Sequence, residues 1–153
     1  MAEQDYLTAI EAMEKVEREN DSENYGDLQR MYEEACYLYA NQLYDEKRPY
    51  DALPYYRAIP GYKDVERKLD RVCYRMLGRW VSRTGVEMEF REDGTCTING
   101  KDYYFRGSQF AFYTGTQPDQ LKEEWTIYNC DQNVLSVENN KTSIQYSLTR
   151  VQE

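Results

Sequence analysis

The spacing of apolar residues changes near residue 78 of this 153-residue chain. Up to about Leu77 they recur every three to four positions, which is typical of amphipathic helices. Beyond that point they alternate with polar residues at every second position, which is typical of half-buried strands. We therefore predict an α+β chain with two segregated units, residues 1–77 and residues 78–153.

The first half predicts about four helices, joined as antiparallel hairpins. The polar segments Asn20–Asn24 and Asp45–Pro49 separate them, and Pro60-Gly61 ends the third, because Pro lacks a helix donor and Gly accepts a left-handed cap. Pro54 either lies in a first turn or kinks the helix by removing one internal hydrogen bond. The predicted helices cover Tyr6–Val16, Leu28–Leu43, Tyr50–Ile59 and Asp64–Leu77.

Two short motifs recur inside this helical half with the same offset of 37 residues. Asn24-Tyr25-Gly26-Asp27 is followed by Gly61-Tyr62-Lys63-Asp64, and Cys36-Tyr37 is followed by Cys73-Tyr74. A fixed offset of this length indicates a helical repeat.

The helical half also places small and aromatic residues where paired helices would meet. They are Ala40, Ala52 and Tyr56, and the segment that contains them ends near Pro60. The segment resembles the tetratricopeptide family of helix-turn-helix repeats, in which small residues let paired helices approach closely. That resemblance implies a groove lined by the first helix of each pair, and it implies binding of a peptide or protein there. The matching face carries Tyr37, Asn41, Tyr44 and Tyr74. The alternative is that these tyrosines pack against neighbouring helices or the second unit.

The second half predicts about eight short antiparallel strands in an up-and-down meander that curls into a small barrel or half-barrel. Asp93-Gly94 and Asn99-Gly100 predict type I′ hairpin turns. The strands are expected around Trp80 and Cys96 and over residues 86–90, 101–106, 109–114, 123–128, 133–138 and 143–149. Inward positions are assigned to Met88, Phe90, Phe105, Phe110, Phe112, Trp125, Ile127, Leu135, Ile144, Tyr146 and Leu148, and we expect them to fill the interior.

Gly78-Arg79-Trp80 opens the first of these strands and Arg150 closes the last. This arrangement resembles the Gly-x-Trp start and the late Arg of the lipocalin-like families. The resemblance implies that Trp80 closes one barrel end and that Arg150 packs over its ring in a cation-π contact. It also implies an alternative function, the binding of a small apolar ligand inside the barrel.

Charge narrows the range of partners. The net charge is -9, and residues 1–77 hold 17 acidic and 11 basic residues against 11 and 8 in residues 78–153. Phosphate-rich partners need Lys and Arg to displace counterions, so nonspecific binding to nucleic acid or to an anionic membrane is disfavoured. The acidic helical half favours a basic peptide or protein instead.

The usual constellations of catalytic residues are missing. The chain has no His, and Cys36, Cys73, Cys96 and Cys130 show no Cys-x-x-Cys spacing, so we expect neither a metal site nor a cofactor. The four cysteines are expected to be buried free thiols, although the strands could bring Cys96 and Cys130 together as a disulfide. No catalytic residue is assigned, while a carboxylate pair assembled across elements stays open.

These observations favour a non-enzymatic binding or adaptor protein that holds a partner in the tyrosine-lined groove. The alternatives are a small apolar ligand in the barrel, or a structural spacer in a larger assembly. No apolar run approaches the roughly 20 residues that span a bilayer, so we expect no direct membrane insertion. As given, the chain is expected to be cytoplasmic, and an upstream segment removed from it would instead make an anchored, extracytoplasmic form.

Overall fold

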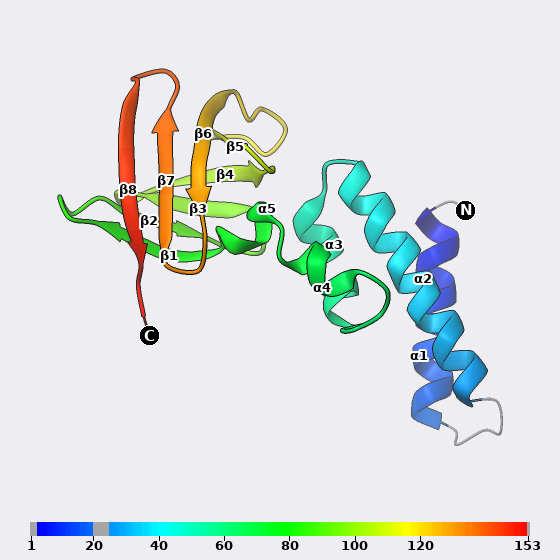
Figure 1. The fold of residues 1–153 in the computed structure, drawn as a ribbon. Coiled ribbons are helices and arrows are strands. Elements are labelled where there is room, and N and C mark those ends of the chain that lie inside the picture. Colours follow the sequence, from blue (N-terminus) through cyan, green and yellow to red (C-terminus); the bar gives the residue numbers. More distant parts are fainter. Residues whose placement is uncertain (1–2, 20–24, 153) are drawn as a thin grey trace. The chain divides into compact units, whose positions relative to one another are not determined.

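The computed structural model describes residues 3–19 and 25–152, and the side chains of residues 6–15 and 26–152. The chain divides into two compact units, Met1–Leu69 and Asp70–Glu153, earlier than the boundary expected at Leu77. The first is helical and the second is a β-barrel, so the expected α+β architecture with segregated units is confirmed (Figure 1). The expected Asn20–Asn24 break and the side chain of Val16 lie outside the described parts.

The helical unit has two long antiparallel helices followed by two shorter ones. Helices α1 and α2 lie side by side (Figure 1), and the apolar stripe of α2 packs against α3. The bounds are α1 Glu3–Glu19, α2 Tyr25–Asp45, α3 Pro49–Arg57 and α4 Val65–Leu69. The buried core of the unit includes Ile10, Met13, Cys36, Tyr39, Ala40, Leu43, Ala52, Leu53, Tyr56, Ile59 and Val65.

The connection from α2 to α3 follows from local chain chemistry. At the end of α2, the Arg48 amide donates to the Leu43 carbonyl at 2.9 Å and the Lys47 amide donates to the Tyr44 carbonyl at 3.0 Å. This is a Schellman cap, and it places Lys47 in the left-handed region at a φ of 65°. Pro49 then begins α3, where its fixed φ suits a first turn.

Pro54 lies inside α3 rather than in its first turn. Of the two alternatives from the sequence, the structure therefore has the one in which Pro interrupts the helical hydrogen bonding, because Pro54 has no amide proton to donate. The helix ends soon afterwards at Arg57, and the Ala58 amide still donates to the Pro54 carbonyl at 3.1 Å.

The tetratricopeptide-like repeat is not supported, and the predicted helix over Asp64–Leu77 is wrong. Instead, α4 ends at Leu69 and a separate short helix, α5 (Val72–Arg75), belongs to the second unit. Between them Arg71 is extended, with a ψ of 151°, and the Arg75 guanidinium pairs with the Asp70 carboxylate through nitrogen–oxygen distances of 2.9 and 2.5 Å. This side-chain pair spans the break, and no Gly or Pro marks the break in the sequence.

The second unit is a closed barrel of eight antiparallel strands, each hydrogen-bonded to the next, with β8 returning to β1 (Figure 1). This confirms the up-and-down meander and is consistent with a lipocalin-like barrel. The first four strands are β1 Gly78–Ser82, β2 Glu87–Phe90, β3 Thr95–Ile98 and β4 Lys101–Gly107. The last four are β5 Ala111–Gly115, β6 Glu123–Cys130, β7 Val134–Asn139 and β8 Ile144–Arg150.

The two predicted hairpin turns differ in type. Asn99 and Gly100 have φ values of 50° and 81°, as a type I′ turn requires. At Asp93-Gly94 only Gly94 has a positive φ, 85°, and its amide donates to the Arg91 carbonyl at 3.2 Å. The turn at Asp93-Gly94 is therefore a longer loop that ends on a left-handed glycine, which corrects the type I′ prediction for this turn.

Most predicted inward positions are buried, including Met88, Phe90, Phe112 and Leu148. Phe110 is the main exception, with 71% of its surface exposed, because it precedes β5 and so lies outside the alternating pattern. Ile144 is 50% exposed for a similar reason, since it is the first residue of β8. The alternation therefore holds within strands and fails at their ends.

Candidate functional site

An open apolar groove of ≈490 Å³ runs along the helical unit between α1 and α2, and we call it the α1–α2 groove. Its apolar members follow helical spacing on both helices, so each helix contributes one stripe along its axis. The apolar lining consists of Tyr6, Ala9 and Met13 from α1, Met31, Ala35 and Leu38 from α2, and Tyr62.

Exposure distinguishes this stripe of α2 from the core stripe on its other side. Met31 is 62% exposed and Leu38 is 39% exposed, whereas Cys36 and Leu43 on the core stripe are buried. A helix that is apolar on two faces has more apolar surface than its own unit buries. Neighbouring exposed apolar side chains of this kind commonly mark interaction sites.

Polar contacts from the loop before α4 hold one wall of the groove. The Tyr62 hydroxyl donates to Glu34 on α2, and the Lys63 ammonium lies 3.0 Å from the same carboxylate. These two partners lower the pKa of Glu34 from its ordinary value of 4.5, with the tyrosine hydrogen bond as the larger cause. The wall residue Tyr62 is thereby fixed to the helix that forms the groove.

Tyr37, the first residue of the expected tyrosine-lined surface, takes part in the same loop attachment. Its hydroxyl donates to the Asp64 carboxylate at 2.6 Å, and its ring meets Tyr62 edge-on at 5.6 Å between ring centres. The ammonium groups of Lys63 and Lys68 lie 5.0 and 5.6 Å from the Tyr37 ring centre. Tyr37 therefore ties α2 to the loop and to the start of α4.

The other three candidates have separate surroundings. Asn41 accepts a hydrogen bond of 2.6 Å from the buried Tyr56 hydroxyl, which ties α2 to α3. Tyr44 is half-buried near the end of α2. Tyr74 is buried in α5, within the second unit. Thus Tyr37, Asn41 and Tyr44 share α2, and Tyr74 does not belong to the helical unit.

In the barrel, Trp80 and Arg150 are direct cross-strand partners. The Arg150 guanidinium lies 4.2 Å from the Trp80 ring centre, so the expected contact is present. Trp80 is buried, and its indole nitrogen donates to the Met76 carbonyl at 2.9 Å. Arg150 also donates to the carbonyls of Leu77, Gln132 and Arg75, at 2.8, 2.8 and 2.6 Å. It therefore joins β8 to the chain that enters β1.

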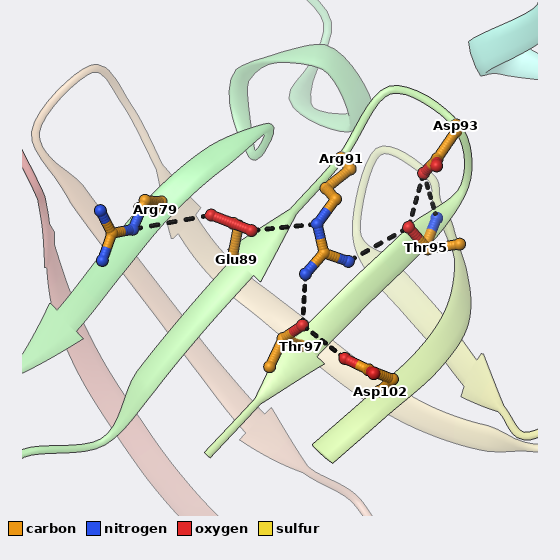
Figure 2. A network of polar contacts seen from close by, with 7 residues as sticks. All are labelled: Arg79, Glu89, Arg91, Asp93, Thr95, Thr97 and Asp102. Carbon is orange, nitrogen blue, oxygen red and sulfur yellow. Dashed lines mark hydrogen bonds and ion pairs between the residues drawn. The ribbon is translucent and has the colours of Figure 1, made fainter. Parts of the chain in front are cut away.

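A polar network covers the outer face of β1 to β4 (Figure 2). Arg79, Glu89, Thr97 and Asp102 are successive cross-strand neighbours, so the pairing register alone aligns them. Arg91 donates to Glu89 at 3.0 Å, to Thr95 at 3.1 Å and to Thr97. All three guanidinium nitrogens of Arg91 are engaged within the network. A hollow of ≈230 Å³ lies beside it.

Aromatic side chains fill much of the barrel interior. Phe90 meets Phe105 and Phe112 at ring-centre distances of 5.1 and 5.2 Å, and Phe112 stacks on Trp125 at 5.2 Å. The Trp125 indole donates to the buried Thr114 hydroxyl at 3.2 Å, which satisfies both polar groups. This interior is packed, as the sequence led us to expect.

The structure gives the cysteines little reactivity. All four are buried as free thiols. Burial raises the pKa of Cys36 and Cys130 to about 11 and that of Cys96 to about 12, so these thiols stay protonated at neutral pH.

Among the described residues, no three His, Cys, Asp or Glu side chains cluster to hold a metal ion. Within the same residues, no helix combines the length and apolar character needed to cross a bilayer.

The residues missed by the sequence analysis are Met31, Ala35 and Leu38. They recur at positions i, i+4 and i+7, which is a helical stripe in its own right. This spacing is a signal in the sequence, but α2 also carries the stripe through Cys36 and Leu43, and spacing alone does not show which of the two stripes the unit buries. Comparison with family models, with curated proteins and with solved structures finds no match to this chain. The geometry of the two units is therefore the basis for a functional proposal.

Proposed function

We propose that this chain is a non-enzymatic binding protein whose helical unit captures a peptide or protein partner in the α1–α2 groove. The observation that carries the proposal is the exposure of Met31 and Leu38 on a helix whose other apolar face is already buried. Covering such side chains removes apolar surface from water, which favours association.

The composition of the groove supports a protein partner. Met31 and Met13 are flexible and polarisable, and methionine is common at surfaces that adapt to a partner's side chains. Tyr6 and Tyr62 add rigid aromatic area with a polar tip, a combination enriched at interfaces.

The tyrosine surface expected from the sequence stays a prediction. Two of its members, Tyr37 and Asn41, already serve as hydrogen-bond partners within the unit, and binding there would compete with those bonds. For that reason we centre the proposal on the apolar groove. A small apolar ligand inside the barrel remains the alternative from the sequence, and the aromatic packing of the interior offers no observation in its favour.

The proposal is tested by replacing Met31 with a photo-crosslinking amino acid in the native cell, with a matched replacement of the exposed Lys101 as control. A partner trapped only from position 31 is then purified and titrated against the wild-type protein and the double variant Met31→Gln/Leu38→Gln. We expect at least about tenfold weaker binding by the variant, because it lacks two apolar side chains that the partner covers in the complex. Equal affinity of the two proteins would contradict the proposal.

A further inference from the structure

We infer that the occupant of the α1–α2 groove is an amphipathic α-helix with a basic polar face. This inference rests on the proposed function and specifies the partner class for the same site. It is carried by three features: the length of the groove and its small lining residues, the scarcity of polar groups in its walls, and the net charge of the helical unit.

The dimensions suit a short helix. The α2 stripe from Met31 to Leu38 and the α1 stripe from Tyr6 to Met13 each cover eight residues, and the seven steps between their ends span roughly 10 Å at 1.5 Å per residue. This is about two turns of a third helix lying along the pair. Ala9 and Ala35 contribute small side chains to the lining, which allows the close approach of packed helices, at roughly 8–10 Å between axes.

The walls favour a helix over an extended segment. Residues Met31 to Leu38 lie within α2, so their backbone groups are used by the helix itself and offer no edge for strand pairing. Glu34, the acidic residue of the lining, already receives Tyr62 and Lys63. An extended peptide would bury backbone amides and carbonyls without partners, whereas a helix satisfies its own backbone.

Charge selects the sign of the partner's polar face. Residues 1–69 contain 16 acidic and 9 basic residues, a net charge of -7 for this unit, whereas residues 70–153 contain 12 and 10, a net charge of -2. Arg30 also lines the groove, but the Asp27 carboxylate lies 4.0 Å from its guanidinium and offsets its charge. A helix with Lys or Arg opposite its apolar stripe is therefore attracted, and the attraction weakens as salt screens it.

Three fluorescent peptides of about 14 residues test the inference, all with the same leucine stripe at helical spacing. The first has lysines on the polar face. The second has one central lysine replaced by proline, which keeps the stripe and breaks the helix. The third has glutamates in place of the lysines. Each is titrated into the full chain, into Met31→Gln/Leu38→Gln, and into the control Phe110→Gln/Tyr128→Gln, which removes exposed apolar side chains from the barrel unit.

We expect the lysine peptide to bind wild type and the barrel control equally, and to bind Met31→Gln/Leu38→Gln at least about tenfold more weakly. The proline and glutamate peptides should each bind wild type at least about tenfold more weakly than the lysine peptide, and added salt should narrow the lysine–glutamate difference. Circular dichroism should show unchanged helix content in both double variants, because the replaced side chains are exposed.

The contrary outcomes separate the inference from the proposed function. If the proline or glutamate peptide binds as well as the lysine peptide and Met31→Gln/Leu38→Gln loses all of them, the groove is a docking site and the inferred partner class is wrong. If none of the three peptides binds the chain at about 0.5 mM, or if all of them bind this variant as tightly as wild type, both ideas are overturned. Self-association of the chain that is abolished by the same variant would make a second copy the occupant and overturn the inference.

Discussion

Gly78 and Arg150 show how one residue can constrain another on the adjacent strand. Gly78 has a φ of 121°, in the region that side chains other than glycine rarely adopt. A Cβ placed there would lie 2.6 Å from an Arg150 guanidinium nitrogen. That guanidinium cannot simply move aside, because three carbonyl groups and the Trp80 ring hold it. The short Gly-x-Trp motif therefore has a physical reason in this chain.

The Gly78→Ala variant should lower the free energy of barrel unfolding by about 2 to 4 kcal/mol, since backbone strain and displacement of Arg150 add together. Gly85→Ala is the matched control, because Gly85 has a φ of 90° and a Cβ there meets nothing within 4 Å. Urea unfolding followed by tryptophan fluorescence measures both. Equal losses would mean that Arg150 yields without cost, which would contradict the constraint described here.

The stability that Glu34 gives to the groove wall should depend on pH. The hydrogen bond from Tyr62 and the nearby Lys63 lower its pKa in the folded protein. A group with a depressed folded pKa adds stability above its unfolded pKa and loses it as pH falls through the folded value. Thermal unfolding followed by helix signal should therefore show a midpoint that drops as pH falls below the ordinary value of 4.5.

The Glu34→Gln variant isolates this contribution. Gln keeps the size of the side chain and removes the titrating charge, so the midpoint should fall less steeply with acid than in wild type. Asp64 has a pKa lowered chiefly by Tyr37 and will contribute its own acid sensitivity in both proteins. Identical pH profiles for wild type and Glu34→Gln would show that the Tyr62–Glu34–Lys63 attachment is not formed in solution.

At the scale of elements, α2 is the helix on which the binding proposal depends. One of its stripes packs into the unit and the other is exposed in the groove. Periodicity predicts both stripes equally, and sequence alone does not say which one the unit covers. Sequence likewise does not show the break at Asp70 and Arg71, because no Gly or Pro stands there and the chain is extended at Arg71 between α4 and α5.

The end of α2 offers a direct test of its cap. Lys47 occupies the left-handed position of the Schellman cap, where glycine avoids a steric cost of roughly 1 kcal/mol. Lys47→Gly should therefore raise the free energy of unfolding of the helical unit by about that amount. Thermal unfolding monitored by circular dichroism measures the change.

Lys63→Gly serves as a contrast for this test. Lys63 also has a positive φ, 48°, but its ammonium pairs with Glu34 at 3.0 Å. The relief of strain there is offset by loss of the pair and of the contacts with the Tyr37 and Tyr62 rings. Lys63→Gly should gain less than Lys47→Gly, and a larger gain would argue against the attachment of this loop to α2.

At the scale of the whole molecule, the change in apolar spacing correctly predicts two units and their classes. The alternation also predicts the eight strands, because each strand carries its own period. The residue at which the two units divide is harder to predict from the sequence. Arg150 and Trp80 donate hydrogen bonds to the carbonyls of residues 75–77, which precede the first strand. Those backbone acceptors leave no trace in side-chain patterns, so the change of period near residue 78 places the boundary later than the contacts do.

A pair of fragments tests this division. Residues 70–153 keep all three carbonyl acceptors, whereas residues 78–153 lack them. At roughly 1 kcal/mol per hydrogen bond, and with the buried Cys73, Tyr74 and Met76 lost as well, the shorter fragment should be less stable by more than about 3 kcal/mol. Urea unfolding of both fragments checks this, and equal midpoints would return the boundary to Leu77.

Binding of a partner in the α1–α2 groove can be detected at the methionine side chains. The chain has five, and selective ¹³C labelling of their methyl groups gives one NMR signal each. Met13 and Met31 line the groove, while Met76 and Met88 are buried in the barrel unit. Adding the lysine-faced helical peptide should shift the signals of Met13 and Met31 and leave those of Met76 and Met88 in place. Shifts at Met76 and Met88 with none at Met31 would contradict binding in the α1–α2 groove.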